Sequence, residues 1–270
     1  ENAIFDELKE NYTIELLLEN IDRQLLEPKY SLTEEQEKEI DSQMTQIFEM
    51  YSMYYGLTEQ QFLTENGFKD KNDFRDYLAF DYKRNLQYLK YIETLTSEEE
   101  IKKYYDEEIY GEINTKHMLV QVTDKVTEKE AKKMAEEIIK KLNDGKDFDK
   151  VAKEYGDKII FEELGYNGFN SGLVLDYVEA SKKLKNGQYS KEPVKTEYGF
   201  HIIYRIDQKE KPTLDEVKSE ILAALSADLE AKDANLRYKA FIKFREENGL
   251  KIEDSKFKKE YEEYCEKYNK

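Results

Sequence analysis

The first part of the chain has the hydrophobic pattern of helices. Apolar side chains recur at helical spacing across residues 1–110, and no stretch there alternates as a strand would. Thr33 with Gln36 has the spacing of a capping box, which predicts a helix start. Gly56 is the residue type that most often ends a helix in a left-handed conformation. The pattern therefore predicts that residues 1–110 are helical throughout.

The pattern changes near residue 113. The run INTKHMLVQV, beginning at Ile113, and the run YGFHIIYRID, ending at Asp207, each read as a strand. Between them, Thr127 caps a helix, a second helix follows, and dense glycines across 157–199 predict short strands, turns and a short helix near 174–184.

Helical spacing returns after residue 208. One continuous helix is predicted over 214–248, followed by a last amphipathic helix ending near Tyr268. The apolar face of the 214–248 helix needs a partner, and the aromatic face of 74–89 is the natural one. The predicted fold class is α+β. A compact α+β domain at 113–207 interrupts one discontinuous, all-helical domain formed by 1–112 and 208–270.

Composition excludes several classes of function. The 270 residues include 43 Lys and Arg against 60 Asp and Glu, so the net charge is −17 and a nucleic-acid partner is not expected. No apolar run is long enough to span a membrane. The two histidines lie in no short ligand pair and Cys265 is the only cysteine, so we expect no metal, no cofactor and no internal disulfide.

The two histidines are the candidates for chemistry. His117 and His201 lie on the two most clearly predicted strands. Alternation places His117 on the same face as Thr115 and Leu119, and His201 on the face of Ile203. If the strands pair, the imidazoles meet over one face. On spacing alone, the alternative is two unrelated buried histidines.

Four ordered motifs resemble one family. KHMLV at 116–120, LNDGKDFDKVAKEYG at 142–156, LGYNGF at 164–169 and GQYSKEPVKTEYGFHII at 187–203 resemble the parvulin peptidyl-prolyl isomerases. TSEEEIKKYYDE at 96–107 resembles the linker helix that precedes parvulin domains in PrsA and SurA foldases. With its helical flanks, the chain resembles the PrsA-like extracytoplasmic foldases of Gram-positive bacteria.

The resemblance implies a site and a substrate pocket. Matching the motifs residue by residue assigns the catalytic positions to His117, His201, Asp157 and Thr196, and the prolyl pocket to Leu164, Leu173 and Tyr177. Three departures from the family pattern stand out. The loop after Asp157 is short, Tyr177 replaces Phe, and Lys182 stands where a core Phe is common. A buried phenol needs a partner for its hydroxyl.

The implied activity is cis–trans isomerisation of X-Pro bonds in unfolded or partly folded secreted polypeptides. The chain begins at Glu1 without Met, so we expect that a targeting segment has been removed. Family resemblance places the protein at the outer face of the cell membrane, with a lipid anchor, and the helical domain is the part through which a homodimer would form. The alternatives are a holdase with a catalytically weakened parvulin domain and a purely structural helical adaptor.

A patch for binding unfolded chains is also predicted. The segment EMYSMYYG at 49–56 combines Met with Tyr51, Tyr54 and Tyr55, an adaptable aromatic surface suited to clients of varied sequence. The alternative is that this helix end packs inside the domain.

Overall fold

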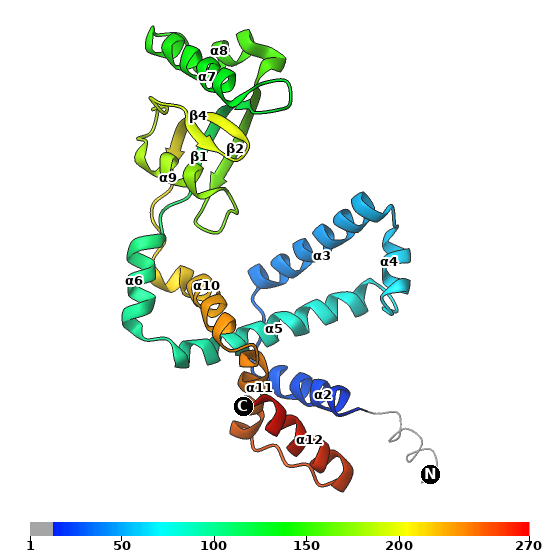
Figure 1. Ribbon diagram of the computed structural model, residues 1–270. Coiled ribbons are helices and arrows are strands. Elements are labelled where there is room, and N and C mark those ends of the chain that lie inside the picture. Colours follow the sequence, from blue (N-terminus) through cyan, green and yellow to red (C-terminus); the bar gives the residue numbers. More distant parts are fainter. Residues whose placement is uncertain (1–12, 270) are drawn as a thin grey trace. The chain divides into compact units, whose positions relative to one another are not determined.

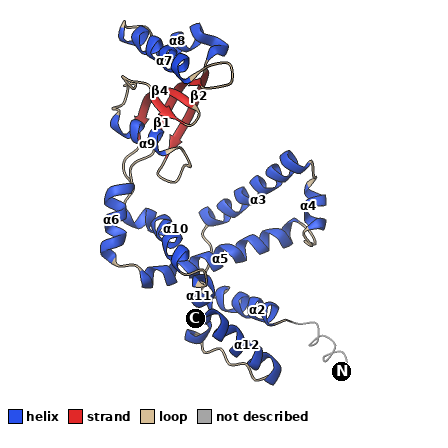
Figure 2. Cartoon of the chain, viewed as in Figure 1, coloured by secondary structure: helices blue, strands red, loops and turns tan. Residues whose placement is uncertain are grey.

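The computed structural model describes residues 13–269 of the chain. It divides into two compact units, one formed by the segments up to Glu98 and from Ser219 onward, the other by Glu99–Lys218. Figure 1 traces the chain through both units, and Figure 2 shows that the strands all lie in the second. No helix among the described residues is long and apolar enough to cross a membrane.

The helical unit is built from capped amphipathic helices. Thr33 and Gln36 form the predicted capping box at the start of α3, and Gly56 ends that helix with a φ of 67°. The helices are α2 (Ile14–Leu26), α3 (Glu34–Tyr55), α4 (Glu59–Glu65), α5 (Lys71–Leu95), most of α10 (Leu214–Lys232), α11 (Leu236–Glu247) and α12 (Ser255–Tyr268).

Aromatic side chains fill the core formed by α3, α4 and α5. Phe48, Phe62 and Phe74 contact one another with ring centroids 5.1 to 5.5 Å apart. Ile40 and Leu78 are buried beside them. Such a cluster buries several large side chains, each contributing about 1.5–3 kcal/mol.

A buried ion pair joins the two segments of the helical unit. Asp22 of α2 accepts two hydrogen bonds from Arg245 of α11, each 2.8 Å long. Only 2–3% of either side chain is exposed. A bidentate pair of this kind specifies which helices pack together, because removing one partner leaves a buried charge unpaired.

The predicted continuous helix over 214–248 is wrong. The helix is interrupted between α10 and α11. The Asp233 side chain accepts a hydrogen bond from the Asn235 backbone amide at 2.9 Å, and this bond competes with continuation of the helix. The predicted partnership of this region with 74–89 is present in the helical unit, where α11 packs against α5. The Tyr88 hydroxyl of α5 donates to Glu230 of α10 at 2.7 Å.

The second unit holds a four-stranded antiparallel sheet in the order β2-β1-β4-β3. The α+β class is thereby confirmed. Its elements are α6 (Glu98–Glu108), β1 (Ile113–Gln121), α7 (Glu128–Asn143), α8 (Phe148–Tyr155), the 3-10 turn η1 (Gly156–Lys158), β2 (Ile160–Asn167), α9 (Leu175–Lys183), β3 (Val194–Thr196) and β4 (Gly199–Gln208).

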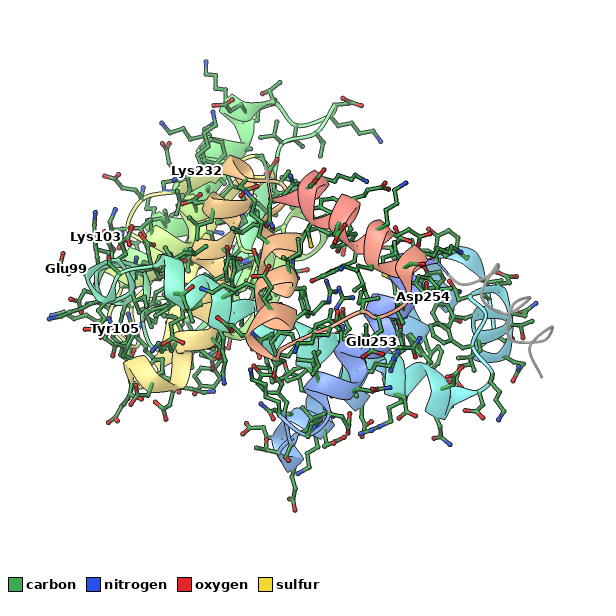
Figure 3. All side chains as sticks on the ribbon, turned by 90° about the horizontal axis from the view of Figure 1, so that it is seen from below. Glu99, Lys103, Tyr105, Lys232, Glu253 and Asp254 are labelled. Carbon is green, nitrogen blue, oxygen red and sulfur yellow. The ribbon has the colours of Figure 1, made fainter. Side chains whose placement is uncertain are left out.

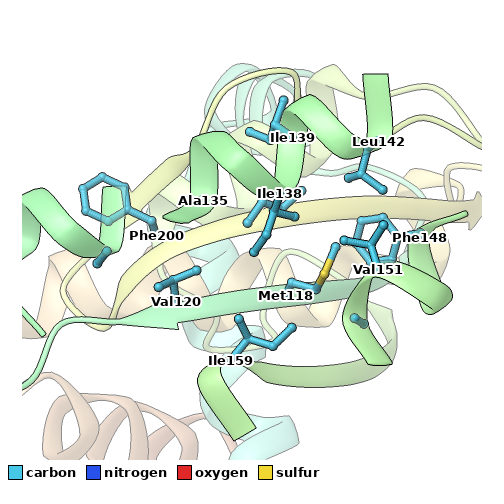
Figure 4. Packing of buried hydrophobic residues seen from close by; sticks show 13 residues of the cluster. Met118, Val120, Ala135, Ile138, Ile139, Leu142, Phe148, Val151, Ile159 and Phe200 are labelled. Atoms are coloured by element: carbon cyan, nitrogen blue, oxygen red, sulfur yellow. The ribbon is translucent and has the colours of Figure 1, made fainter. Parts of the chain in front are cut away.

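Helices α7 and α8 cover one face of this sheet. Met118, Val120 and Phe200 of the strands pack in one buried cluster with Ile138 and Val151 of the helices (Figure 4). Because side chains alternate along a strand, the neighbouring residues of β1 and β4 point to the other face. Helix α9 packs against that other face, near β1, β3 and β4.

The two ends of the sheet domain lie side by side. Gly111 comes so close to the chain leaving β4 that an added Cβ would lie 1.9 Å from the Lys209 carbonyl oxygen. Tyr105 of α6, labelled in Figure 3, donates its hydroxyl to the Pro212 carbonyl at 2.7 Å. These contacts explain why α6 belongs to the second unit, although the sequence places residues up to 112 with the helical domain.

Candidate functional site

The two histidines meet on the face of the sheet that α9 packs against. In the antiparallel register of β1 and β4, His117 lies opposite Ile203, and Leu119 lies opposite His201. The imidazoles are therefore diagonal neighbours on one face, with ring centroids 4.9 Å apart and planes at 86°. Each histidine is only 4% exposed.

Tyr177 of α9 completes a three-ring cluster. Its ring centroid lies 5.5 Å from that of His117 and 5.3 Å from that of His201. Its hydroxyl donates to Thr115 Oγ1 at 3.1 Å and lies 3.2 Å from His117 Nδ1. The buried phenol thus has two partners, which explains how this fold accommodates Tyr where the family pattern has Phe.

Thr196 holds the second histidine. Its Oγ1 lies 2.8 Å from His201 Nε2 and accepts a hydrogen bond from the Tyr198 amide. The remaining ring nitrogens, His201 Nδ1 and His117 Nε2, are buried and have no hydrogen-bond partner among residues 13–269. Each of these nitrogens can therefore form one hydrogen bond with a group from outside the described chain.

Burial keeps the imidazoles neutral. Desolvation, with a smaller contribution from the neighbouring His117, lowers the pKa of His201 to about 4. Desolvation also lowers the pKa of His117, although the carboxylate of Glu162 opposes this shift. Burial raises the pKa of Tyr177 to about 12. At neutral pH the cluster is therefore a polar but uncharged surface.

One carboxylate stands beside this neutral cluster. Glu162 lies directly opposite His117 on β2, and its Oε2 is 3.6 Å from His117 Nε2. Its side chain is 54% exposed. Nothing in the sequence alone singled out Glu162 over its neighbours. To identify it, one would have to know which residues of β2 pair with which residues of β1.

The residues predicted to form the prolyl pocket lie in two places. Leu173 and Tyr177 line one hollow, together with Thr115 and Ile113 of β1. Its other lining residues are Tyr110, Asn167, Val178 and Ser181. Leu164 is half-buried at the bulge where the pairing of β1 with β2 shifts register, and it does not line this hollow. Thr115, two residues before His117 on the same face, is a site residue that sequence reasoning left without a role.

The structure does not bring Asp157 to the histidines. Asp157 lies in η1, and it lines a separate hollow with Met134 and Val126. Only a short segment connects η1 to β2, which keeps Asp157 at the far end of that strand. Lys182, which also departs from the family pattern, is half-buried and forms an ion pair with Glu179 at 2.8 Å.

The predicted aromatic patch is partly core. Tyr51 is half-buried and packs on Phe62, with ring centroids 4.7 Å apart. Tyr54 and Tyr55, by contrast, are 72% and 69% exposed, and Met53 is 74% exposed. The exposed patch therefore consists of Met53, Tyr54 and Tyr55 at the C-terminal end of α3, with Tyr51 beneath it.

Comparisons with known proteins identify relatives of both units. The PPIC-type PPIase (rotamase) domain family matches residues 117–207. Foldase protein PrsA of Geobacillus kaustophilus is 34% identical over 224 residues, or 82% of this chain and 71% of that protein. Foldase protein PrsA of Caldanaerobacter subterraneus is 32% identical over 235 residues, or 85% and 70%. The crystal structure of foldase protein PrsA from Streptococcus pneumoniae shares the fold, with a TM-score of 0.52 at 18% identity, covering 98% of this chain and 95% of that one.

Proposed function

This chain belongs to the PrsA family of foldases and is a peptidyl-prolyl isomerase, and from that premise we propose that it acts outside the cytoplasm on unfolded secreted polypeptides. We propose that the three-ring cluster of His117, Tyr177 and His201 is the catalytic surface. The observation that carries this proposal is the pair of neutral, buried imidazoles, which lie 4.9 Å apart and each have one ring nitrogen that no other described residue contacts by a hydrogen bond.

The cluster suits a reaction that makes and breaks no covalent bond. Rotation about an X-Pro bond crosses a barrier of about 20 kcal/mol, because the planar amide loses its resonance. A surface that excludes water and is complementary to the twisted amide lowers that barrier. Neutral imidazoles fit this task, since they offer hydrogen bonds without fixing a charge beside a neutral amide. The hollow at Leu173 and Tyr177 presents mostly apolar surface, but its volume of about 10 Å³ is too small for a prolyl ring, so we propose that the ring packs over its mouth.

Kinetics on short X-Pro peptides test this assignment. We expect His117→Ala and His201→Ala each to lower kcat/KM by about tenfold or more, as loss of a positioned polar group in a closed site does. Lys195→Ala is a matched control, because Lys195 lies on strand β3 of the same sheet but pairs with Glu128, away from the rings. Unchanged kinetics in the His117→Ala, His201→Ala double variant would remove the histidines from the mechanism.

We propose that Asp157 contributes less to catalysis than the two histidines do. It lines a hollow apart from the rings, so Asp157→Ala is expected to change kcat/KM less than either histidine replacement. A loss as large as that of His117→Ala would mean that Asp157 reaches the substrate in the bound state.

We further propose that the exposed patch of Met53, Tyr54 and Tyr55 holds unfolded clients, a role that a holdase without turnover would share. Flexible thioether and aromatic side chains adapt to clients of varied sequence. Replacing Tyr54 and Tyr55 with Ser should weaken suppression of client aggregation without changing the melting temperature. Tyr51→Ser is the contrasting variant, since it opens the core and should lower the melting temperature. Full protection by the Tyr54, Tyr55 double variant would place client binding elsewhere.

The proposed location is testable in whole cells. A protein at the outer face of the membrane is cleaved by a protease added to intact protoplasts, whereas a cytoplasmic marker survives. Survival of this protein together with the marker would contradict the proposed location.

A further inference from the structure

The charge of the candidate site comes from one residue. Three charged residues in the segment 158–163 could set it, and their signs conflict: Lys158, Glu162 and Glu163. The structure separates them. Lys158 lines the hollow that holds Asp157. Glu163 lies opposite Lys116, one step out of phase with His117, and so points to the other face of the sheet. Only Glu162 faces the histidines.

No cation neutralises this carboxylate among the described residues. The contact of Glu162 with His117 is its only charged contact there, and His117 is neutral at pH 7 because its pKa is lowered. Arg205 lies on the same face, but its guanidinium donates to the Leu184 carbonyl at 2.6 Å and to Asn186 at 2.9 Å. The half-exposed carboxylate of Glu162 therefore gives the face over the rings a net negative charge.

The position of Glu162 relative to the hollow decides which part of a substrate meets it. The hollow lies toward Ile113 and Thr115, whereas Glu162 lies level with His117, on the edge strand β2. A proline packed over the mouth of the hollow, with its preceding peptide bond over the imidazoles, directs the preceding residue toward Glu162. A lysine or arginine side chain there can reach the carboxylate across several ångströms.

We propose that Glu162 selects substrates in which a cationic residue precedes the proline, and that it disfavours an acidic residue at that position. This inference rests on the proposed catalytic surface and names its substrate class. A half-exposed charge pair is modest in strength, so we expect a preference of about fivefold in kcat/KM for Lys-Pro over Ala-Pro peptides, and a further loss for Glu-Pro peptides.

The test uses the full chain and three peptides that differ only in Lys, Ala or Glu before the proline. Glu162→Gln should bring the three kcat/KM values together, and Glu162→Lys should invert their order. Glu163→Gln is the matched control, because it removes the same charge from the neighbouring residue on the opposite face, and it should keep the wild-type order. Raising the salt to about 0.5 M should shrink the preference, as it does for any exposed charge pair.

Two failures can be told apart. If the wild-type protein turns over all three peptides equally, or if Glu162→Gln keeps the order, the role of Glu162 is wrong while the isomerase site stands. If no peptide is turned over, the catalytic surface is wrong. Binding of the same peptides, followed by fluorescence anisotropy, then still tests Glu162: equal affinities for the Lys-Pro and Glu-Pro peptides would overturn the inference.

Discussion

The histidine cluster makes a prediction about acid that can be measured residue by residue. Desolvation lowers the pKa of His201 to about 4 from an ordinary value of 6.5. The unfolded chain therefore takes up a proton at His201 as the pH falls below 6.5, whereas the folded chain stays neutral there until about pH 4. The stability that this difference contributes is complete above pH 6.5 and is lost progressively as the pH falls to 4.

The size of the effect follows from the two pKa values. The full difference corresponds to about 3 kcal/mol, of which about 2 kcal/mol is lost between pH 7 and pH 5. His201 is 4% exposed, so solvent screening removes little of it. For the unit that contains the sheet, this loss is a large share of an ordinary stability of 5–15 kcal/mol.

The assay benefits from a chain with only two histidines. Histidine-labelled protein gives two ring signals in NMR, and a His117→Asn variant assigns them. We expect the His201 signal to titrate near pH 4 and the His117 signal below 6.5, with His117 the higher of the two because Glu162 opposes its shift.

Urea unfolding at pH 7 and pH 5 measures the free energy of unfolding that the prediction concerns. A His201→Gln variant cannot take up the proton, so its stability should fall by about 2 kcal/mol less than that of the wild type over this range. Carboxylates elsewhere titrate equally in both proteins and cancel in the comparison. Two ring signals that both titrate near 6.5 would refute the reasoning, because they would show that the imidazoles are solvated.

Two further predictions concern buried hydrogen bonds. Tyr177→Phe should cost about 1–2 kcal/mol of stability in urea unfolding, since the Thr115 hydroxyl loses its partner, while peptide turnover persists because the apolar ring remains. Asp22→Asn should destabilise the helical unit by about 3–5 kcal/mol by leaving Arg245 unpaired, whereas Glu19→Gln, at an exposed pair, should change stability by less than about 1 kcal/mol. A cost at Asp22 no larger than at Glu19 would show that Arg245 finds other partners.

Local sequence signals predicted helix starts well where a few neighbouring residues decide the backbone conformation. The capping boxes at Thr33 and Thr127 start helices as expected, because side chain and backbone satisfy each other within four residues. The break after α10 escaped prediction for the opposite reason. Asp233 competes for the backbone with an apolar pattern that continues across it, and periodicity alone does not show which interaction is stronger.

The site was predictable only as far as the strands it lies on. Alternation gave the face of each histidine within its own strand, and the common face was expected only if the two strands paired; the register of β1 with β4 makes the histidines neighbours. Glu162 and Asp157 depend instead on β2, whose register contains a bulge next to Leu164. A shift of one residue moves every side chain of a strand to the other face, so the sequence left the choice between Glu162 and Glu163 open.

The helical unit is formed by two chain segments, and it must fold although the sheet domain is inserted between them in the sequence. Asp22 and Arg245 come from opposite ends of the chain, so their buried pair forms only when both segments of the helical unit are together. The sheet domain lies between these segments in sequence. Its entry and exit are adjacent, because Gly111 lies against Lys209 and Gln208 donates to the Gly111 carbonyl at 2.8 Å. Because the inserted domain begins and ends at the same place, it acts toward the helical unit as a loop whose two ends are close together. Lengthening such a loop adds little entropic cost to folding. The sheet domain can therefore carry the proposed catalytic face without separating the helices that Asp22 and Arg245 hold together.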